Sequence, residues 1–211
     1  MSLKAKLATL VMTVAFIAPV GTSATAATPL TQTEIEAVAS QVFNSANPEA
    51  AFAQLTPEVQ QQLTAATTEA SEEITSQTEI LKMDPNVVGM DAVSAGATAC
   101  YKISGYGKGK SLAGVTLYEY RTQLQYCVNK QGIVSTKWVS RTGQAKFPGW
   151  KYNGLGASAK TNTAKSVSAY QQYHFALAPI GKNFPAQNVD PCQGLRVTST
   201  GTQKTDFRCG V

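Results

Sequence analysis

Histidine is rare in this 211-residue chain, and acidic residues are rare in its second half. It contains one histidine, His174, and its last 116 residues carry only three acids, Glu119, Asp190 and Asp206. A metal site built from histidine, cysteine and grouped carboxylates lacks its ligands here, and we expect neither a metal nor a cofactor. A hydrolase would have to use His174 as general base with one of these acids, and no nucleophile motif accompanies it.

The chain also lacks an apolar run long enough to span a membrane. The longest run, residues 7–20, is about 14 residues long, whereas a spanning helix needs roughly 20. Lys4 and Lys6 precede it, and Ala24-Thr25-Ala26 follows as a cleavage site. This order is typical of a secretory signal peptide over residues 1–26, with the mature chain starting at Ala27 or Thr28. We therefore expect a secreted, extracellular protein without a transmembrane anchor.

The four cysteines form neither a CxxC pair nor a cluster with histidine, so a redox or metal role is not predicted. In an exported chain they indicate two disulfides, for which three pairings exist. A two-residue turn at Thr200-Gly201 would place Cys192 directly opposite Cys209 in a non-hydrogen-bonded pair. Cys100 and Cys127 are similarly related across residues 105–114. We predict the bridges Cys100–Cys127 and Cys192–Cys209.

Charge is divided very unevenly along the chain. Residues 28–95 contain ten acids and one base, a net charge of −9, and residues 96–211 contain fifteen bases and three acids, a net charge of +12. We expect an acidic segment over residues 27–95 and a basic domain over residues 96–211. One hypothesis is that the acidic segment docks on the basic domain and competes with an anionic ligand. The alternative is a soluble spacer.

The acidic segment has the start signals of helices. Thr31 and Glu34 have the spacing of a capping box, and Pro48 and Pro57 each follow a capping residue. Apolar residues then recur at helical spacing. These signals predict short helices from about residue 28 to residue 90.

The basic domain has the alternation of β-strands. Residues 115–128 place Tyr118, Tyr120, Thr122, Leu124 and Tyr126 on one face, and charged or amide side chains on the other. Further strands are expected at 133–142, 166–177, 195–199 and 202–208. The predicted fold class is α+β, with short acidic helices before an antiparallel β-sandwich or partly open barrel that carries two disulfides. Residues 105–111 superficially resemble a phosphate loop, but Ser104 replaces its first glycine, and we interpret them as a mobile hairpin loop.

Aromatic and basic residues gather without acids between residues 137 and 154. Tyrosine and tryptophan suit sugar rings, whereas lysine and arginine suit phosphate or carboxylate groups. The alternative is that these aromatic side chains fill a small core. The candidate ligand-binding residues are Trp138, Trp150, Tyr152, Lys137, Arg141, Lys146 and Lys151.

Several motifs resemble those of a group of small secreted β-rich proteins from actinobacteria. They are residues 114–118, 125–134, 148–154 and 172–175, together with Phe184-Pro185, and the likeness covers residues 98 to about 185. The resemblance implies secretion and a β-rich fold, and it implies no catalytic residue. The group tends to carry a cysteine soon after the motif that contains Phe175, where this chain has Ala178.

These observations favour a secreted, non-enzymatic binding protein that acts at the cell wall or another extracellular surface. Its expected partners are an anionic cell-wall polymer, a glycan or membrane head groups, and not nucleic acid. Two alternatives are a secreted hydrolase that uses His174 with an acidic partner and a pore-forming or membrane-active β protein. For the latter, Glu119 and Arg121 would be costly in lipid.

Overall fold

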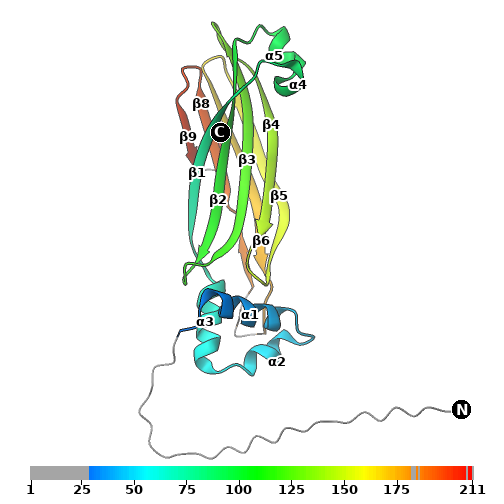
Figure 1. Cartoon of the computed structure of the whole chain (residues 1–211), viewed down its shortest axis with the longest axis vertical. Helices are drawn as coiled ribbons and strands as arrows, with labels where there is room; N and C mark the ends of the chain where they lie inside the picture. Colours follow the sequence, from blue (N-terminus) through cyan, green and yellow to red (C-terminus); the bar gives the residue numbers. More distant parts are fainter. Residues whose placement is uncertain (1–28, 182–183, 185, 208, 211) are drawn as a thin grey trace, which may run out of the picture.

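The computed structural model describes residues 29–181, 184, 186–207 and 209–210. Two antiparallel sheets run along the long axis of the molecule, with three helices at one end and two short helices at the other (Figure 1). The predicted signal peptide and both predicted start sites, Ala27 and Thr28, lie outside the described residues.

The first sheet consists of consecutive strands in the order β1-β2-β3-β4, and the second has the order β5-β6-β8-β9, with β7 paired to β6. The strands are β1 (Glu69–Leu81), β2 (Ala99–Ser111), β3 (Thr116–Asn129), β4 (Gly132–Ala145), β5 (Trp150–Asn162), β6 (Ser166–Leu177), β7 (Gln187–Val189), β8 (Cys192–Thr198) and β9 (Gln203–Asp206). The sheets face each other, with β4 beside β5 and β1 beside β9. The expected combination of short helices with antiparallel β structure is confirmed. The two sheets have a sandwich-like arrangement.

The helices begin where their capping signals predict. They are α1 (Gln32–Phe43), α2 (Pro48–Ala53) and α3 (Pro57–Thr67), and α4 (Pro85–Val88) and α5 (Met90–Ser94) follow β1. Thr31 caps α1 in a complete capping box with Glu34. The hydroxyl of Thr56 accepts a hydrogen bond from the amide of Val59 at the start of α3. Local chemistry therefore sets these starts.

The first three helices pack on the end of the sheets. Ile35, Val42 and Leu63 belong to one buried cluster together with Leu117 of β3 and Phe175 of β6. This segment is a docked part of the fold, and the spacer interpretation of the helices is wrong. Short helices gain most of their stability from such packing.

The acidic segment is not helical throughout, which corrects the prediction for residues 28–90. Residues 69–81 form β1, which pairs with β2 along nearly its whole length. Two cross-strand ion pairs join these strands, from Glu73 to Lys108 (2.9 Å) and from Glu79 to Lys102 (2.5 Å). The predicted boundary at residue 95 therefore divides one sheet, because β1 belongs to the acidic half and β2 to the basic half.

Strand β3 confirms the predicted alternation. Its tyrosines face the second sheet, and Tyr118 stacks on Phe175 with ring centroids 4.3 Å apart. Tyr120 stacks on Tyr173 at 4.9 Å. Aromatic contacts of this kind join the facing sheets.

The segment interpreted as a mobile loop, residues 105–111, lies within β2, so that prediction is wrong. Only residues 112–115 connect β2 to β3. Gly107 and Gly109 lie against the rings of Tyr120 and Tyr118, and a Cβ atom at either glycine would collide with a ring. Glycine is needed at these positions because large rings cross the backbone of β2.

Both predicted cysteine pairs are bridged. Cys100 and Cys127 are direct cross-strand partners with Cα atoms 4.1 Å apart, and they are buried beside Val88 of α4 and Ala92 of α5. The Cα atoms of Cys192 and Cys209 are 5.4 Å apart.

The predicted register of the last hairpin is wrong by one residue. Val197 pairs with Gln203, and the Thr198 amide donates to the Thr202 carbonyl, so three residues (199–201), not two, form the turn, with Gly201 at a positive φ of 89°. This is the geometry of a three-residue hairpin loop. Strand β9 ends at Asp206, and Cys209 reaches Cys192 from beyond the end of the strand.

Candidate functional site

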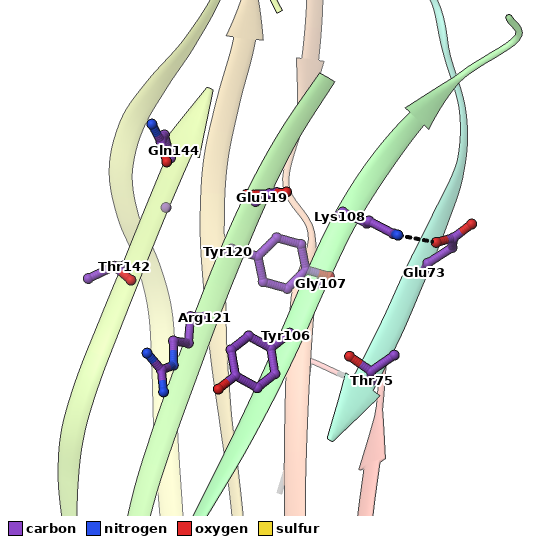
Figure 2. A pocket seen from close by; sticks show the side chains of 11 residues that line it. Glu73, Thr75, Tyr106, Gly107, Lys108, Glu119, Tyr120, Arg121, Thr142 and Gln144 are labelled. Carbon is purple, nitrogen blue, oxygen red and sulfur yellow. Dashed lines mark ion pairs between the residues drawn. The ribbon is translucent and has the colours of Figure 1, made fainter. Parts of the chain in front are cut away.

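A pocket of about 630 Å³ lies on the outer face of the first sheet. Its lining comes from all four strands (Figure 2) and comprises Glu73, Thr75, Tyr106, Gly107, Lys108, Glu119, Tyr120, Arg121, Thr142, Gly143 and Gln144. We call it the outer-face pocket. Its outward side chains form two rows across the strands, because the register aligns them as direct neighbours: Glu73, Lys108, Glu119 and Gln144 in one row, and Thr75, Tyr106, Arg121 and Thr142 in the other.

The first row is rich in paired charges. Lys108 contacts Glu73, and Lys146, just beyond β4, contacts Glu119 at 3.3 Å. The hydrogen bond from Lys108 holds the pKa of the Glu73 carboxyl below its ordinary value. This carboxylate is therefore ionised at neutral pH and suits hydrogen-bond acceptance rather than proton donation.

The second row contains the aromatic side chain of the site. Arg121 lies over the Tyr106 ring, with its guanidinium carbon 4.9 Å from the ring centroid. Figure 2 shows the two side chains next to each other on neighbouring strands. A cation–π contact of this kind restrains both groups. Thr75 and Thr142 flank them with hydroxyl groups.

The inner side of the pocket adjoins a cluster of carboxyl and phenol groups. Tyr120, whose ring lies beneath Gly107, donates a hydrogen bond to Glu72 (3.2 Å), and Tyr118 donates one to Glu69. Burial raises the pKa of Glu72 to about 7, and the nearby Glu69 adds to the shift. Burial also raises the pKa of Glu69. Glu72 thus titrates near neutrality, directly behind the pocket.

The aromatic members of the sequence-predicted site do not form a binding surface. Trp150 is only 5% exposed, and its indole N–H donates to the Thr67 carbonyl. Tyr152 is half-buried, with its ring centroid 5.2 Å from that of Phe175. Both rings contribute to the core, which was the alternative to ligand binding. Trp150 cannot stack on an external ligand. Trp138 is partly buried against the interior of the sheets.

The basic members of the predicted site are dispersed. Arg141 lies 5.2 Å from the Trp138 ring and donates a hydrogen bond to Gln171 of the second sheet (3.0 Å). Lys137 and Lys151 are exposed on β4 and β5, which belong to different sheets. Lys146 alone adjoins the outer-face pocket, through its ion pair with Glu119.

The single histidine has one of its three predicted acidic partners. His174 Nδ1 lies 2.6 Å from a carboxylate oxygen of Asp190, and both side chains are partly exposed. Glu119 pairs with Lys146, and Asp206 lies near Arg196 on the β8–β9 hairpin. Within the described ranges, no hydroxyl or thiol is hydrogen-bonded to His174. The pair therefore lacks the neighbouring nucleophile that a catalytic triad requires.

The outer-face pocket is not recognisable in the sequence, because its residues come close together only when the strands pair. Tyr106 and Lys108 lie in the segment interpreted as a loop, and Glu73 and Thr75 in the segment interpreted as helical. The sequence signal for this pocket is the alternation of Tyr106 with Lys108 and of Glu119 with Arg121. It indicates outward faces but not which residues face each other.

Comparisons with protein-family profiles, curated proteins and solved structures found no match. In the part of the chain that the structure describes, no helix is long and apolar enough to cross a membrane. The described residues also contain no group of three or more histidine, cysteine or acidic side chains placed to hold a metal ion.

Proposed function

We propose that the chain is a secreted, non-enzymatic binding protein with an antiparallel β-sandwich fold, and that it binds a glycan in the outer-face pocket. One observation carries the proposal. A single pocket combines the Tyr106 ring with two cross-strand rows of carboxylate, amide, hydroxyl and cationic side chains. Sugars present hydroxyl groups at their edges and C–H groups on their faces, which such rows and an aromatic ring complement.

The position of the pocket favours a saccharide over a peptide. An extended peptide gains affinity by adding a strand to a free sheet edge, or from apolar pockets for its side chains. The outer-face pocket instead lies across paired strands, where the backbone groups of β2 and β3 already bond to their neighbours. Its polar side chains, rather than its backbone, are available to a ligand.

Secretion is supported by the signal-like N-terminus and by the disulfides. Two bridges are typical of proteins that fold in an oxidising compartment. An extracellular location would bring the pocket into contact with wall or surface polysaccharides. We accordingly propose that the protein acts at the cell wall or another extracellular surface.

Titration of the isotope-labelled mature protein with oligomers of glucose, N-acetylglucosamine and galacturonate, followed by NMR, tests this proposal. We expect amide shifts to concentrate on β2 and β3 around Tyr106 for at least one oligomer. Tyr106→Ala should weaken that binding at least tenfold by calorimetry, and the exposed Lys165→Gln should not change it.

Two results would contradict the glycan proposal. One is a set of shifts confined to β5 and β6, or to β1 as the edge strand of its sheet, the latter being the pattern of a peptide adding a strand. The other is unchanged affinity of Tyr106→Ala for an oligomer that wild type binds.

A further inference from the structure

Arg121 differs from the other charged side chains of the outer-face pocket in its partners. Lys108 is neutralised by Glu73, and Glu119 by Lys146. Among the described residues, no carboxylate lies within ion-pair distance of Arg121, and its side chain makes no hydrogen bond. Within the described residues, the positive charge of Arg121 is therefore not balanced by an ion pair.

The surroundings of Arg121 hold it in place. The phenol of Tyr173 donates a hydrogen bond to the Arg121 carbonyl (2.8 Å), which fixes the strand from the opposite sheet. The Tyr106 ring restrains the guanidinium group. Nε is buried without a hydrogen-bond partner. The two terminal nitrogens make no hydrogen bond or ion pair with the described residues, so they remain for a ligand.

A guanidinium group has a defined preference among ligands. Its planar nitrogens match the paired oxygens of a carboxylate or a phosphate, and it keeps its charge at any pH that the protein meets. Glu119 lies two residues away on the same face of β3, roughly 7 Å along the strand. A ligand that contacts both rows would thus place its oxyanion at Arg121 and its hydroxyl groups at the first row.

We propose that Arg121 is an oxyanion-binding subsite and that the glycan bound in the outer-face pocket is acidic, with a carboxylate or phosphate group. This inference rests on the proposed function. The oxyanion subsite narrows the ligand class from glycans in general to acidic saccharides. The oxyanion of such a ligand would lie about one sugar unit from the hydroxyl groups that the first row binds. The neutral part of the ligand would contact Tyr106.

The test compares an acidic saccharide with its uncharged methyl ester and with an oligomer that carries phosphate instead of carboxylate. Calorimetry with the mature protein would use an oligogalacturonate, its methyl ester and a glycerol phosphate oligomer at low and physiological salt. We expect the wild type to bind the acid at least tenfold more tightly than the ester, with a preference that falls as salt rises. Tight binding of the phosphate oligomer instead would identify phosphate as the source of the oxyanion.

Variants at residue 121 separate charge from shape. Arg121→Gln should abolish the preference for the acid and leave affinity for the ester within about twofold, and Arg121→Lys should keep only part of the preference. Lys165→Gln, an exposed charge on the β5–β6 turn, is the matched control and should behave as wild type. Thermal unfolding would confirm that each variant is folded.

The outcomes distinguish this inference from the proposal on which it rests. If acid and ester bind equally, or if Arg121→Gln retains the preference, the oxyanion subsite is wrong while the glycan proposal stands. If no saccharide probe binds and Tyr106→Ala changes nothing, the glycan proposal itself fails.

Discussion

Glu72 shows how a single residue can make the stability of this fold depend on pH. Its carboxyl group lies behind the outer-face pocket, beside the hydroxyl of Tyr120 and the second carboxyl, Glu69. The ordinary pKa of 4.5 rises to about 7, mainly because burial opposes the charged form. The folded protein therefore keeps a proton that the unfolded chain releases between pH 4.5 and 7.

From this shift we predict that the free energy of unfolding falls as pH rises from 4.5 to 7. In that window the folded state binds more protons than the unfolded state, which gives the slope a negative sign. The expected fall is about 1 to 2 kcal/mol once partial exposure of the carboxyl is allowed for. Glu72→Gln should remove most of the fall and be more stable than wild type at pH 8. Urea unfolding at several pH values provides the measurement.

The control for this prediction is Glu36→Gln, which changes a partly exposed carboxylate on α1. It should keep the pH dependence of wild type. Parallel stability curves for wild type and Glu72→Gln would show that Glu72 ionises normally in the folded protein. Data below pH 4.5 do not bear on the question, because the lowered pKa values of Glu34 and Glu58 give a slope of the opposite sign there.

At the scale of elements, the three N-terminal helices are coupled to the sheets through shared core packing. Leu63 of α3 is fully buried in the same cluster as Leu117 and Trp150. A protein that starts near residue 96 would lose these helices and also β1, the edge strand of the first sheet. Point substitutions therefore test the coupling more cleanly than truncation.

We expect Leu63→Ala to lower the free energy of unfolding by about 2 to 4 kcal/mol, because it leaves a cavity in a shared core. The loss should appear in a single transition, reported equally by far-ultraviolet circular dichroism and by tryptophan fluorescence. Gln61→Ala, an exposed change on the same helix, should have almost no effect. A separate early melting of helical signal, with an unchanged β transition, would show that the helices are only loosely attached.

At the scale of the whole molecule, the predicted covalent form can be checked on secreted material. We predict that the mature chain starts at Ala27 or Thr28 and carries the bridges Cys100–Cys127 and Cys192–Cys209. N-terminal sequencing and peptide mapping without reduction would establish both. A secreted chain that starts at Met1, or a peptide that links Cys127 to Cys192, would contradict the prediction.

The sequence predicted those features that local chemistry determines. Thr31 and Thr56 mark helix starts because their side chains satisfy free amides, and β3 is recognisable because its tyrosines alternate with polar residues. Strand β1 was missed because its serine, threonine and glutamate residues form no apolar stripe, and pairing with β2 decides its conformation.

The candidate site was less predictable than the fold for a related reason. The neighbours of Arg121 are set by the registers of β2, β3 and β4, which depend on turn lengths and bulges. The same difficulty produced the one-residue error in the β8–β9 hairpin, where a three-residue turn replaced the expected two-residue turn. The aromatic residues near Pro148 were predicted to bind a ligand because aromatic and basic residues are frequent there. Composition does not distinguish a buried ring such as Trp150 from an exposed one.

The positions of the two disulfides have a mechanical consequence. Each bridge closes a loop within one sheet, and neither joins the two sheets. If an extracellular protein of this design is pulled from its ends, the sheets can separate, but the chain inside each loop cannot lengthen while its bridge is intact. Sequence separations of 27 and 17 residues correspond to about 90 Å and about 60 Å of extended chain. Reduction would thus release roughly 150 Å of additional chain length.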